Sequence, residues 1–423
     1  GYGLFAGRLP RVYFGNAFSR TNVDSDYVYN IGQYGPSAGP IPNLSTGSVT
    51  GITDPRFFWT RSSQSDYVYG QNGYRLYAFT HFTDPNFEGP STYKSNIALN
   101  LQFANGYDVR FEYNKDSVNK ALMWKDLSYS EEGTLADGRA LLDQRENPYL
   151  TNTGEGGGEA FSIIATKAFD NGVNLYAGYT NMEMEDASRV ASAQADSAYN
   201  KQPHDLAGEN LRAAPSDFMV DDKLIIGLDY TTQIFGTNDT RFSVLANRKS
   251  GRRYSLVYET GNSENSITDG NWEAYDLIYV PTGVNDPNVV FASDAVASSV
   301  MNFLSSGCAA GFSGQIMTRN ACKGDYATRV DLRITQDFQV NDDQKIVIYF
   351  DIQNLINFLD DDKGWQTEID TNSVSRAVSV DLDQTTDSGQ LYITGVNEDA
   401  GLIYSTDYGQ SQWQMNLGIS YKF

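Results

Sequence analysis

The chain has 423 residues, a formal net charge of −22 and 13% aromatic residues, with 28 Tyr among them. The negative charge argues against a nucleic-acid-binding protein, which needs a basic face. No run of about 18 apolar residues occurs, which excludes a transmembrane helix but not a membrane β-barrel, because half of every barrel strand is polar.

The first residues, 1–8, already read as the middle of a strand. We therefore expect the chain to be a processed or partial piece of an exported protein. Residues 9–90 follow, rich in Gly, Pro, Asn, Asp and Ser and without a sustained pattern. A loop of this length is usually functional or disordered.

Four tight hairpins come next, with strands that alternate apolar and polar residues around short turns. They comprise 93–104 with 107 to about 130, 161–169 with 173 to about 182, 224–231 with 241 to about 258, and 329–335 with 345–353. A last strand covers 412–423. With the opening segment, the sequence predicts about ten strands.

Short and long connections alternate strictly along the chain. The short turns lie near 105, 171, 237 and 342, and the long polar segments cover 9–92, 131–160, 183–217, 259–325 and 354–411. In an antiparallel barrel, alternate connections emerge at the same rim, and bacterial outer-membrane barrels have short periplasmic turns and long extracellular loops. The pattern predicts an all-β, transmembrane antiparallel barrel occupying residues 1–423.

The closing strand supports this interpretation. Its apolar set lies on one face and is bounded by Trp413 at one end and by Tyr421 and Phe423 at the other. Trp413 and Tyr421 would stand about 20 Å apart vertically in a tilted strand, close to the height of an outer-membrane apolar band. We predict these three aromatics to be membrane-girdle residues. The last strand of a soluble β-sandwich would also alternate.

The polar faces of the strands carry charges of both signs. A Lys or Arg that faced lipid near the midplane would cost about 2–4 kcal/mol. These charges should therefore line a wet lumen or face a polar plug. They include Arg110, Glu112, Arg329, Asp331, Arg333, Lys345 and Asp351.

Little in the sequence suggests catalysis. The two histidines, His81 and His204, lie in predicted loops, so we expect no enzyme and no catalytic residues. Cys308 and Cys322 lie in one Gly-rich segment and would form a disulfide in an oxidising compartment; two free thiols are the alternative.

Two acidic groups lie in predicted extracellular loops. They are Glu183, Glu185 and Asp186, and Asp360, Asp361 and Asp362. Such carboxylates could hold Ca²⁺. Their spacing does not match an EF-hand loop, and solvated acidic loops are the alternative, so we predict neither a metal site nor a cofactor.

Aromatic residues in the predicted loops are candidates for stacking on an extracellular ligand. They are Tyr27, Tyr29, Trp59, Tyr67 and Trp365. Packing within the loops themselves is the alternative.

Five blocks of sequence resemble the C-terminal barrel half of TonB-dependent outer-membrane receptors, in particular the Oar-like branch. They are GYGLFAGRLPRVYFGNAFSRT at the start, YDLIYVPTGVNDPNVVF from Tyr275, RVDLRITQDF from Arg329, FDIQNLINFLDDDKGW from Phe350 and the ending LGISYKF. Family members have 22 strands, a plug domain and a TonB box. Neither the plug nor the box is visible in this chain.

The resemblance implies transport of a large or scarce ligand across the outer membrane of a Gram-negative bacterium. It implies as partners the TonB complex, acting through the plug, and the barrel assembly machinery, which would recognise the terminal Phe423. The other expected partners are outer-membrane lipid, lipopolysaccharide and an unknown extracellular ligand. A passive or structural barrel, such as a pore, an adhesin or a surface-assembly scaffold, is the alternative function.

Overall fold

A computed structural model describes residues 1–8, 82–126, 131–142, 148–189, 192, 194–204, 211–260, 267–268, 275–368, 374–397, 400, 403–404 and 411–423. Among these residues, no helix is long and apolar enough to cross a membrane.

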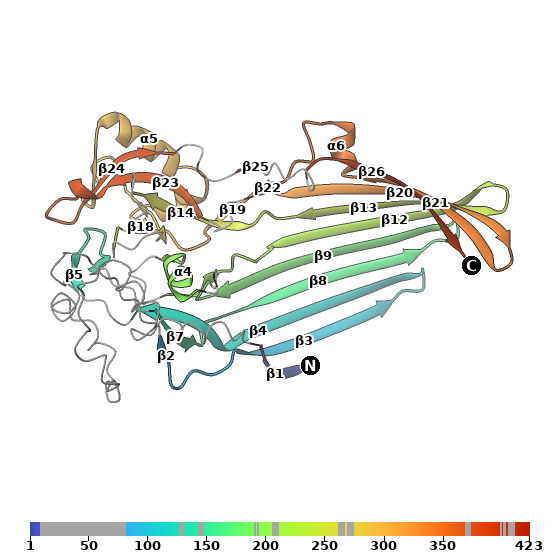
Figure 1. Ribbon diagram of the computed structural model, residues 1–423, viewed down its shortest axis with the longest axis horizontal. Helices are drawn as coiled ribbons and strands as arrows, with labels where there is room; N and C mark the ends of the chain where they lie inside the picture. The colour runs from blue at the N-terminus through green and yellow to red at the C-terminus, as the bar shows by residue number, and fades with distance from the viewer. Residues whose placement is uncertain are drawn as a thin grey trace, which may run out of the picture.

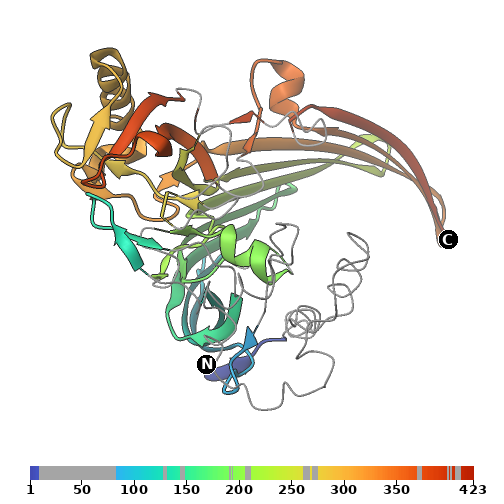
Figure 2. The same ribbon diagram turned by 60° about the vertical axis from the view of Figure 1, so that its left-hand side comes forward.

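Ten strands form one antiparallel main sheet, and their order in the sheet is their order along the chain. The strands are β1 (Tyr2–Ala6), β3 (Ser91–Gln102), β4 (Tyr107–Asp126), β8 (Gly156–Ala168), β9 (Val173–Asp186), β12 (Asp222–Phe235), β13 (Asn238–Lys249), β20 (Ala327–Asn341), β21 (Gln344–Gln353) and β26 (Gln414–Lys422). Figure 2 shows this sheet curled like part of a barrel wall, with β1 and β26 as its separated edges. The predicted all-β fold and its ten strands are confirmed.

The register aligns apolar side chains in rows on one side of the sheet, which we call the outer face. One row joins Leu228, Val244, Leu332, Ile352 and Met415 across five neighbouring strands. Many residues of this face have no protein packed on them, and Leu417 and Ile419 are 75% and 73% exposed. Aromatic residues lie toward both ends of the strands on this face, among them Tyr93, Phe103, Tyr113, Phe161, Tyr179, Trp413 and Tyr421.

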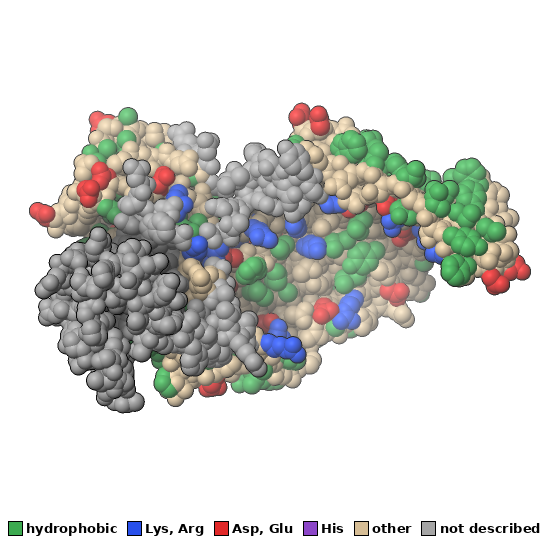
Figure 3. Space-filling model, in the orientation of Figure 1, with side chains coloured by type: hydrophobic (Ala, Val, Ile, Leu, Met, Phe, Trp, Pro, Cys, Tyr) green, Lys and Arg blue, Asp and Glu red, His purple; other side chains and the backbone are tan. Residues whose placement is uncertain are grey.

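The opposite, concave side of the sheet is the inner face. Figure 3 looks onto this side and shows Lys and Arg side chains interspersed with Asp and Glu over the sheet. Because side chains alternate in a strand, the same strands that present the apolar rows outward carry these charges inward. The expected separation of charge from apolar surface is therefore present.

Five long connections emerge at one end of the sheet and the short turns at the other (Figure 1). They are not merely polar loops. They contain β2 (Phe82–Thr83), β5 (Glu131–Thr134), β6 (Ala140–Leu142), β7 (Pro148–Thr153), α4 (Ala195–Asn200), β10 (Pro203–His204), β11 (Ala214–Pro215), β14 (Arg253–Glu259), β15 (Tyr275–Asp276), β16 (Tyr279–Val280), β17 (Val289–Phe291), α5 (Asp294–Leu304), η2 (Gly307–Phe312), β18 (Gln315–Ile316), β19 (Cys322–Lys323), α6 (Leu355–Leu359), β22 (Thr367–Glu368), β23 (Val374–Asp381), η3 (Leu382–Gln384), β24 (Leu391–Val396) and β25 (Ile403–Tyr404).

Part of these connections folds into a unit that we call the loop subdomain. Its five-stranded sheet has the order β17-β24-β23-β14-β19 and packs with α5. Its core is apolar and includes Leu135, Leu256, Ile278, Val300, Leu304, Val378 and Ile393, all nearly inaccessible to solvent. Residues from three connections share this core, so they form one packed body rather than separate loops.

Three predicted strand boundaries were wrong. The strand expected over 241–258 ends at Lys249, and β14 resumes at Arg253 in the sheet of the loop subdomain. The backbone here passes so close to another segment that a Cβ at Gly251 would lie 2.3 Å from the carbonyl carbon of Gly324. Only glycine allows this approach, and the chain changes sheets at this point.

The glycine cluster before residue 160 was predicted to be loop, yet β8 begins at Gly156. Gly157 has a φ of 142°, and a Cβ at Gly158 would lie 2.4 Å from the carbonyl oxygen of Glu183. These glycines therefore let β8 lie closely against β4 and β9. The extended pairing also carries β9 to Asp186, beyond the predicted end near 182.

On the inner face, the ring of Tyr349 covers Gly418 of the neighbouring strand. A Cβ at Gly418 would lie 2.2 Å from the Cζ atom of Tyr349. The guanidinium of Arg333 lies 5.2 Å from the centre of the same ring. The missing side chain thus makes the space in which Tyr349 joins β21 to β26.

We expect Gly418→Ala to destabilise the folded full-length protein by about 1–3 kcal/mol, the usual cost of overpacking. Denaturant unfolding in detergent measures this. Ser420→Ala, on the same face of β26, is the control and should have little effect. In a Tyr349→Ala background the Gly418→Ala change should also become nearly neutral; an undiminished loss there would contradict the packing explanation.

Candidate functional site

The inner face of β20 and β21 carries a set of paired charges. Arg333 binds both carboxylate oxygens of Asp351, at 2.6 and 2.7 Å. The other pairs are Arg329 with Asp331 at 2.8 Å and Lys345 with Asp337 at 2.5 Å. Lys345 of β21 thus pairs with a residue of the neighbouring strand β20, and the charge of Asp351 is neutralised by Arg333. This part of the inner face is polar, and its positive and negative charges balance locally.

The same arrangement recurs on the inner face of β3 and β4. Lys94 lies 2.9 Å from Asp116, and Arg110 lies 2.8 Å from Glu112. The amide of Asn96 also donates to Glu112 at 2.7 Å. Two distant parts of the sheet thus present hydrogen-bonding groups to the concave side, which can keep a hydrated polar surface.

The loop subdomain contains a disulfide between Cys308 and Cys322, whose Cα atoms are 5.0 Å apart. It joins η2 to β19, and Cys322 is fully buried in the core. The bridge closes a loop that contains Arg319 and Asn320, two of the residues through which the subdomain contacts the rim of the main sheet. Arg253 and Lys323 of the subdomain also form ion pairs at the start of β12.

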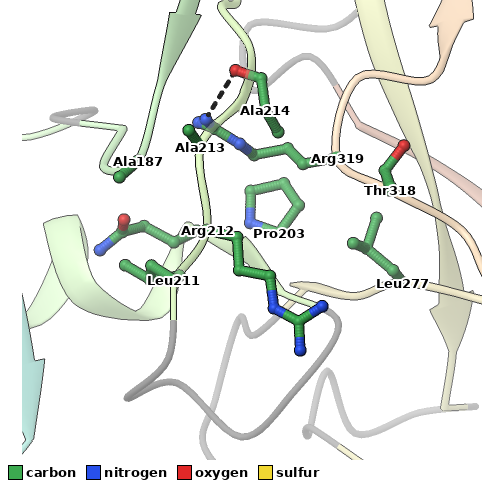
Figure 4. A pocket seen from close by; sticks show the side chains of 10 residues that line it. Ala187, Pro203, Leu211, Arg212, Ala213, Ala214, Leu277, Thr318 and Arg319 are labelled. Carbon is green, nitrogen blue, oxygen red and sulfur yellow. Dashed lines mark hydrogen bonds between the residues drawn. The ribbon is translucent and has the colours of Figure 1, made fainter. Parts of the chain in front are cut away.

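Arg319 and Asn320 clamp the loop subdomain onto the rim of the main sheet. Arg319 donates to the carboxylate of Asp186 at 2.5 Å and to the carbonyl of Ala214 at 3.4 Å, the contact dashed in Figure 4. Asn320, with a φ of 57° and no exposed surface, donates to Asp217 at 2.6 Å. The clamp explains why the subdomain has a defined position above the strands.

The clamp borders a small pocket between the connections. Its walls include Ala187, Pro203, Leu211, Leu277 and Thr318, with Arg212 and Arg319 as charged members (Figure 4). Most of these residues come from the connection between β9 and β11. Leu277 lies between β15 and β16, and Thr318 and Arg319 lie between β18 and β19. Sequence reasoning did not identify this junction, because its members are scattered over more than a hundred positions.

A buried ion pair holds the hairpin of β5 and β6 in the loop subdomain. Arg139 has no exposed surface, donates to Asp137 at 2.5 Å and to the carbonyl of Leu277 at 2.8 Å, and lies over the ring of Tyr258. Burial alone would lower the pKa of Arg139, but the adjacent Asp137 carboxylate raises it above its ordinary value. Burial also raises the pKa of Tyr258 to about 12. Arg139 is therefore a permanent cation within the core.

The two predicted acidic groups differ in structure. Glu183, Glu185 and Asp186 were expected in a loop but belong to the paired end of β9. The carboxylate oxygens of Asp360, Asp361 and Asp362 lie within 4.8 Å of one another, and Asp360 pairs with Lys363 at 2.6 Å. The expectation that these carboxylates form solvated acidic segments without a metal stays a prediction.

Four of the predicted ligand-stacking aromatics, Tyr27, Tyr29, Trp59 and Tyr67, lie outside the described residues, as does His81. Trp365 is 40% exposed and donates from its indole nitrogen to the carbonyl of Asp361 at 2.8 Å. Its role in ligand binding stays a prediction.

The predicted girdle residues are at opposite ends of the closing strand. Trp413 immediately precedes β26 and packs edge-to-face on Phe358, with ring centres 5.3 Å apart. Tyr421 and Phe423 lie 6.0 Å apart at the end of the sheet where the short turns are (Figure 1). Their role as girdle residues stays a prediction.

No family model and no curated protein matches the sequence. Two solved structures are similar in shape at 11% identity. The ferric preacinetobactin receptor BauA from Acinetobacter baumannii has a TM-score of 0.35, with 80% of this chain and 30% of BauA covered. The outer membrane transporter YddB from Escherichia coli has a TM-score of 0.39, with 82% and 35% covered. This chain thus spans about a third of either protein, and scores this low carry no functional inference.

We predict that Arg139→Met will loosen the β5–β6 hairpin. Removing one member of a buried pair leaves the other charge uncompensated, at a cost of about 3–5 kcal/mol. Hydrogen exchange of residues 131–142 in the full-length protein should accelerate by at least about a hundredfold. Lys363→Met, which breaks an exposed pair, is the control and should leave this exchange unchanged. Equal protection in both variants would contradict the role of Arg139.

Proposed function

We propose that this chain forms the C-terminal wall of an outer-membrane receptor that moves a large or scarce ligand across the outer membrane with energy from TonB. The observation that supports this most is the division of the main sheet into an apolar, uncovered outer face and a charged inner face. A barrel wall with lipid outside and water inside needs this division.

The outer face would be unfavourable in water. Contiguous exposed apolar surface beyond a few hundred Å² is rare in soluble monomers and marks a contact with protein or membrane. Here it extends in rows over at least five strands, with aromatics toward both ends. Lipid is the partner that can cover such a curved and continuous surface on every strand.

The position of the loops favours a receptor. The long connections gather at one end and build the loop subdomain, with its own core and disulfide. A rigid surface at the outer rim suits capture of a specific ligand, with Trp365 as one proposed contact. The two edges of the sheet also lie far apart (Figure 2), so a closed barrel requires further strands and would be wide.

The proposed partners follow from this role. They are the lipid and lipopolysaccharide of the outer membrane, the extracellular ligand, the TonB complex acting through a plug outside this chain, and the barrel assembly machinery, which would bind the terminal strand with Phe423. We propose neither catalysis nor a bound cofactor.

A passive or structural barrel is the second candidate function. The loop subdomain favours it, because a stapled, tightly packed body at the rim also suits an adhesin or a scaffold of a surface assembly. Dependence on TonB separates this candidate from the receptor.

Membrane insertion is tested by substitutions on the two faces of β26. Leu417 lies midway between Trp413 and Tyr421 on the outer face. Leu417→Arg should destabilise the inserted full-length protein by about 2–4 kcal/mol, the cost of an Arg near the midplane. Urea titration of folding into lipid vesicles measures this. Asn416→Arg, which faces Asp351 on the inner face, should have little effect, and equal losses for both variants would argue against the lipid-facing assignment.

Energy coupling is tested with the purified full-length protein. The periplasmic domain of TonB should bind it in detergent, and the protein should be closed to ions in a planar bilayer, because a plug fills the lumen. Steady conductance without TonB binding would instead establish the passive barrel. A passive porin is the control and should conduct ions steadily without binding the TonB domain.

A further inference from the structure

A short helix at the rim presents apolar side chains without protein cover. Helix α6 follows the end of β21, and its last two residues, Phe358 and Leu359, are 37% and 73% exposed. Trp365, after the helix, and Trp413, before β26, are also more than a third exposed. We call these four residues the α6 patch.

Two buried asparagines hold the α6 patch in place. Asn354 donates from its amide to the carbonyls of Gly364 at 3.0 Å and Ser411 at 2.7 Å. Asn357 donates to the carbonyl of Lys363 at 2.8 Å and accepts the backbone N–H of Trp413 at 3.2 Å. Both side chains are nearly inaccessible to solvent. The exposed position of the patch is therefore built into the fold and cannot result from a loose turn.

The α6 patch continues the outer face of the main sheet. Trp413 extends the set formed by Met415, Leu417 and Ile419, and its ring packs on Phe358. Hydrophobic side chains follow the upper edge of the molecule from α6 toward the C-terminal end (Figure 3). The surface that faces lipid under the proposed function thus runs without a break onto the helix.

The charges around α6 agree with a position at the boundary between lipid and water. Asp360 is neutralised by Lys363, and Asp361 and Asp362 are exposed. Figure 3 shows acidic side chains gathered at the top, beside the hydrophobic ones. A polar turn next to exposed Trp, Phe and Leu is the composition of a segment that lies in the membrane interface, where Trp is preferred.

We propose that the α6 patch is a lateral anchor that inserts into the interface of the outer leaflet, with lipid as its occupant. The anchor rests on the proposed membrane function and adds to it. It would hold the rim between the last two strands at a constant depth, just below the residues that lead into the loop subdomain. Trp413 would then contact lipid together with both β26 and α6.

Spin labelling of the full-length protein in lipid vesicles tests the anchor. Leu359→Cys, Ile419→Cys and Val284→Cys are labelled one at a time, and collisions with oxygen and with a water-soluble nickel complex are compared. Ile419, on the outer face, is the lipid reference, and Val284, 53% exposed in the loop subdomain, is the aqueous reference. Cys308 and Cys322 are joined and do not react with the label.

For the anchor, the label at residue 359 should show an oxygen-to-nickel ratio well above that at 284 and approaching that at 419. A ratio equal to that at 284 would overturn the anchor while leaving the membrane function intact. Low access to both reagents would overturn it too, because protein, such as a strand paired with β26, would then cover the patch. An aqueous ratio at 419 as well would refute the membrane function itself.

Discussion

Each strand of the main sheet sends alternate side chains to opposite faces, and the antiparallel register aligns these side chains in rows across neighbouring strands. A shift of one residue in any strand would place charges such as Arg333 and Asp351 among Leu332 and Ile352. The two faces can remain chemically different only if every pairing is kept. The ion pairs on the inner face and the ring of Tyr349 over Gly418 are consistent with one register and with no other.

The loop subdomain depends on this sheet because the strand ends determine where its segments start. It is nevertheless stabilised in a different way, by an apolar core, a disulfide and buried charged groups that are ion-paired or hydrogen-bonded. Arg319 and Asn320 connect the two systems, since they are held near the disulfide and bind groups at the rim. Movement of the subdomain would require these hydrogen bonds to break together.

The segment between β21 and β26 is stabilised in a third way. There, Asn354 and Asn357 replace the missing regular structure with hydrogen bonds to backbone carbonyls, and this exposes Trp413 and Leu359 instead of burying them. Buried polar groups are stable when they are hydrogen-bonded, and exposed apolar groups are stable when lipid covers them. The amide nitrogens of Asn354 and Asn357 meet the first condition in this segment, and the second would be met there under the proposed function.

The sequence by itself determined the strands, their faces and the end at which each connection lies, because alternation of residue type and turn chemistry are local signals that appear along the chain. Cys308 and Cys322 could likewise be paired by their proximity in sequence. Tertiary structure alone decided that Gly156 starts a strand, that Arg253 changes sheets and that Arg139 is buried. These outcomes depend on which distant backbone or side chain approaches, and long-range contacts of this kind leave no period in the sequence.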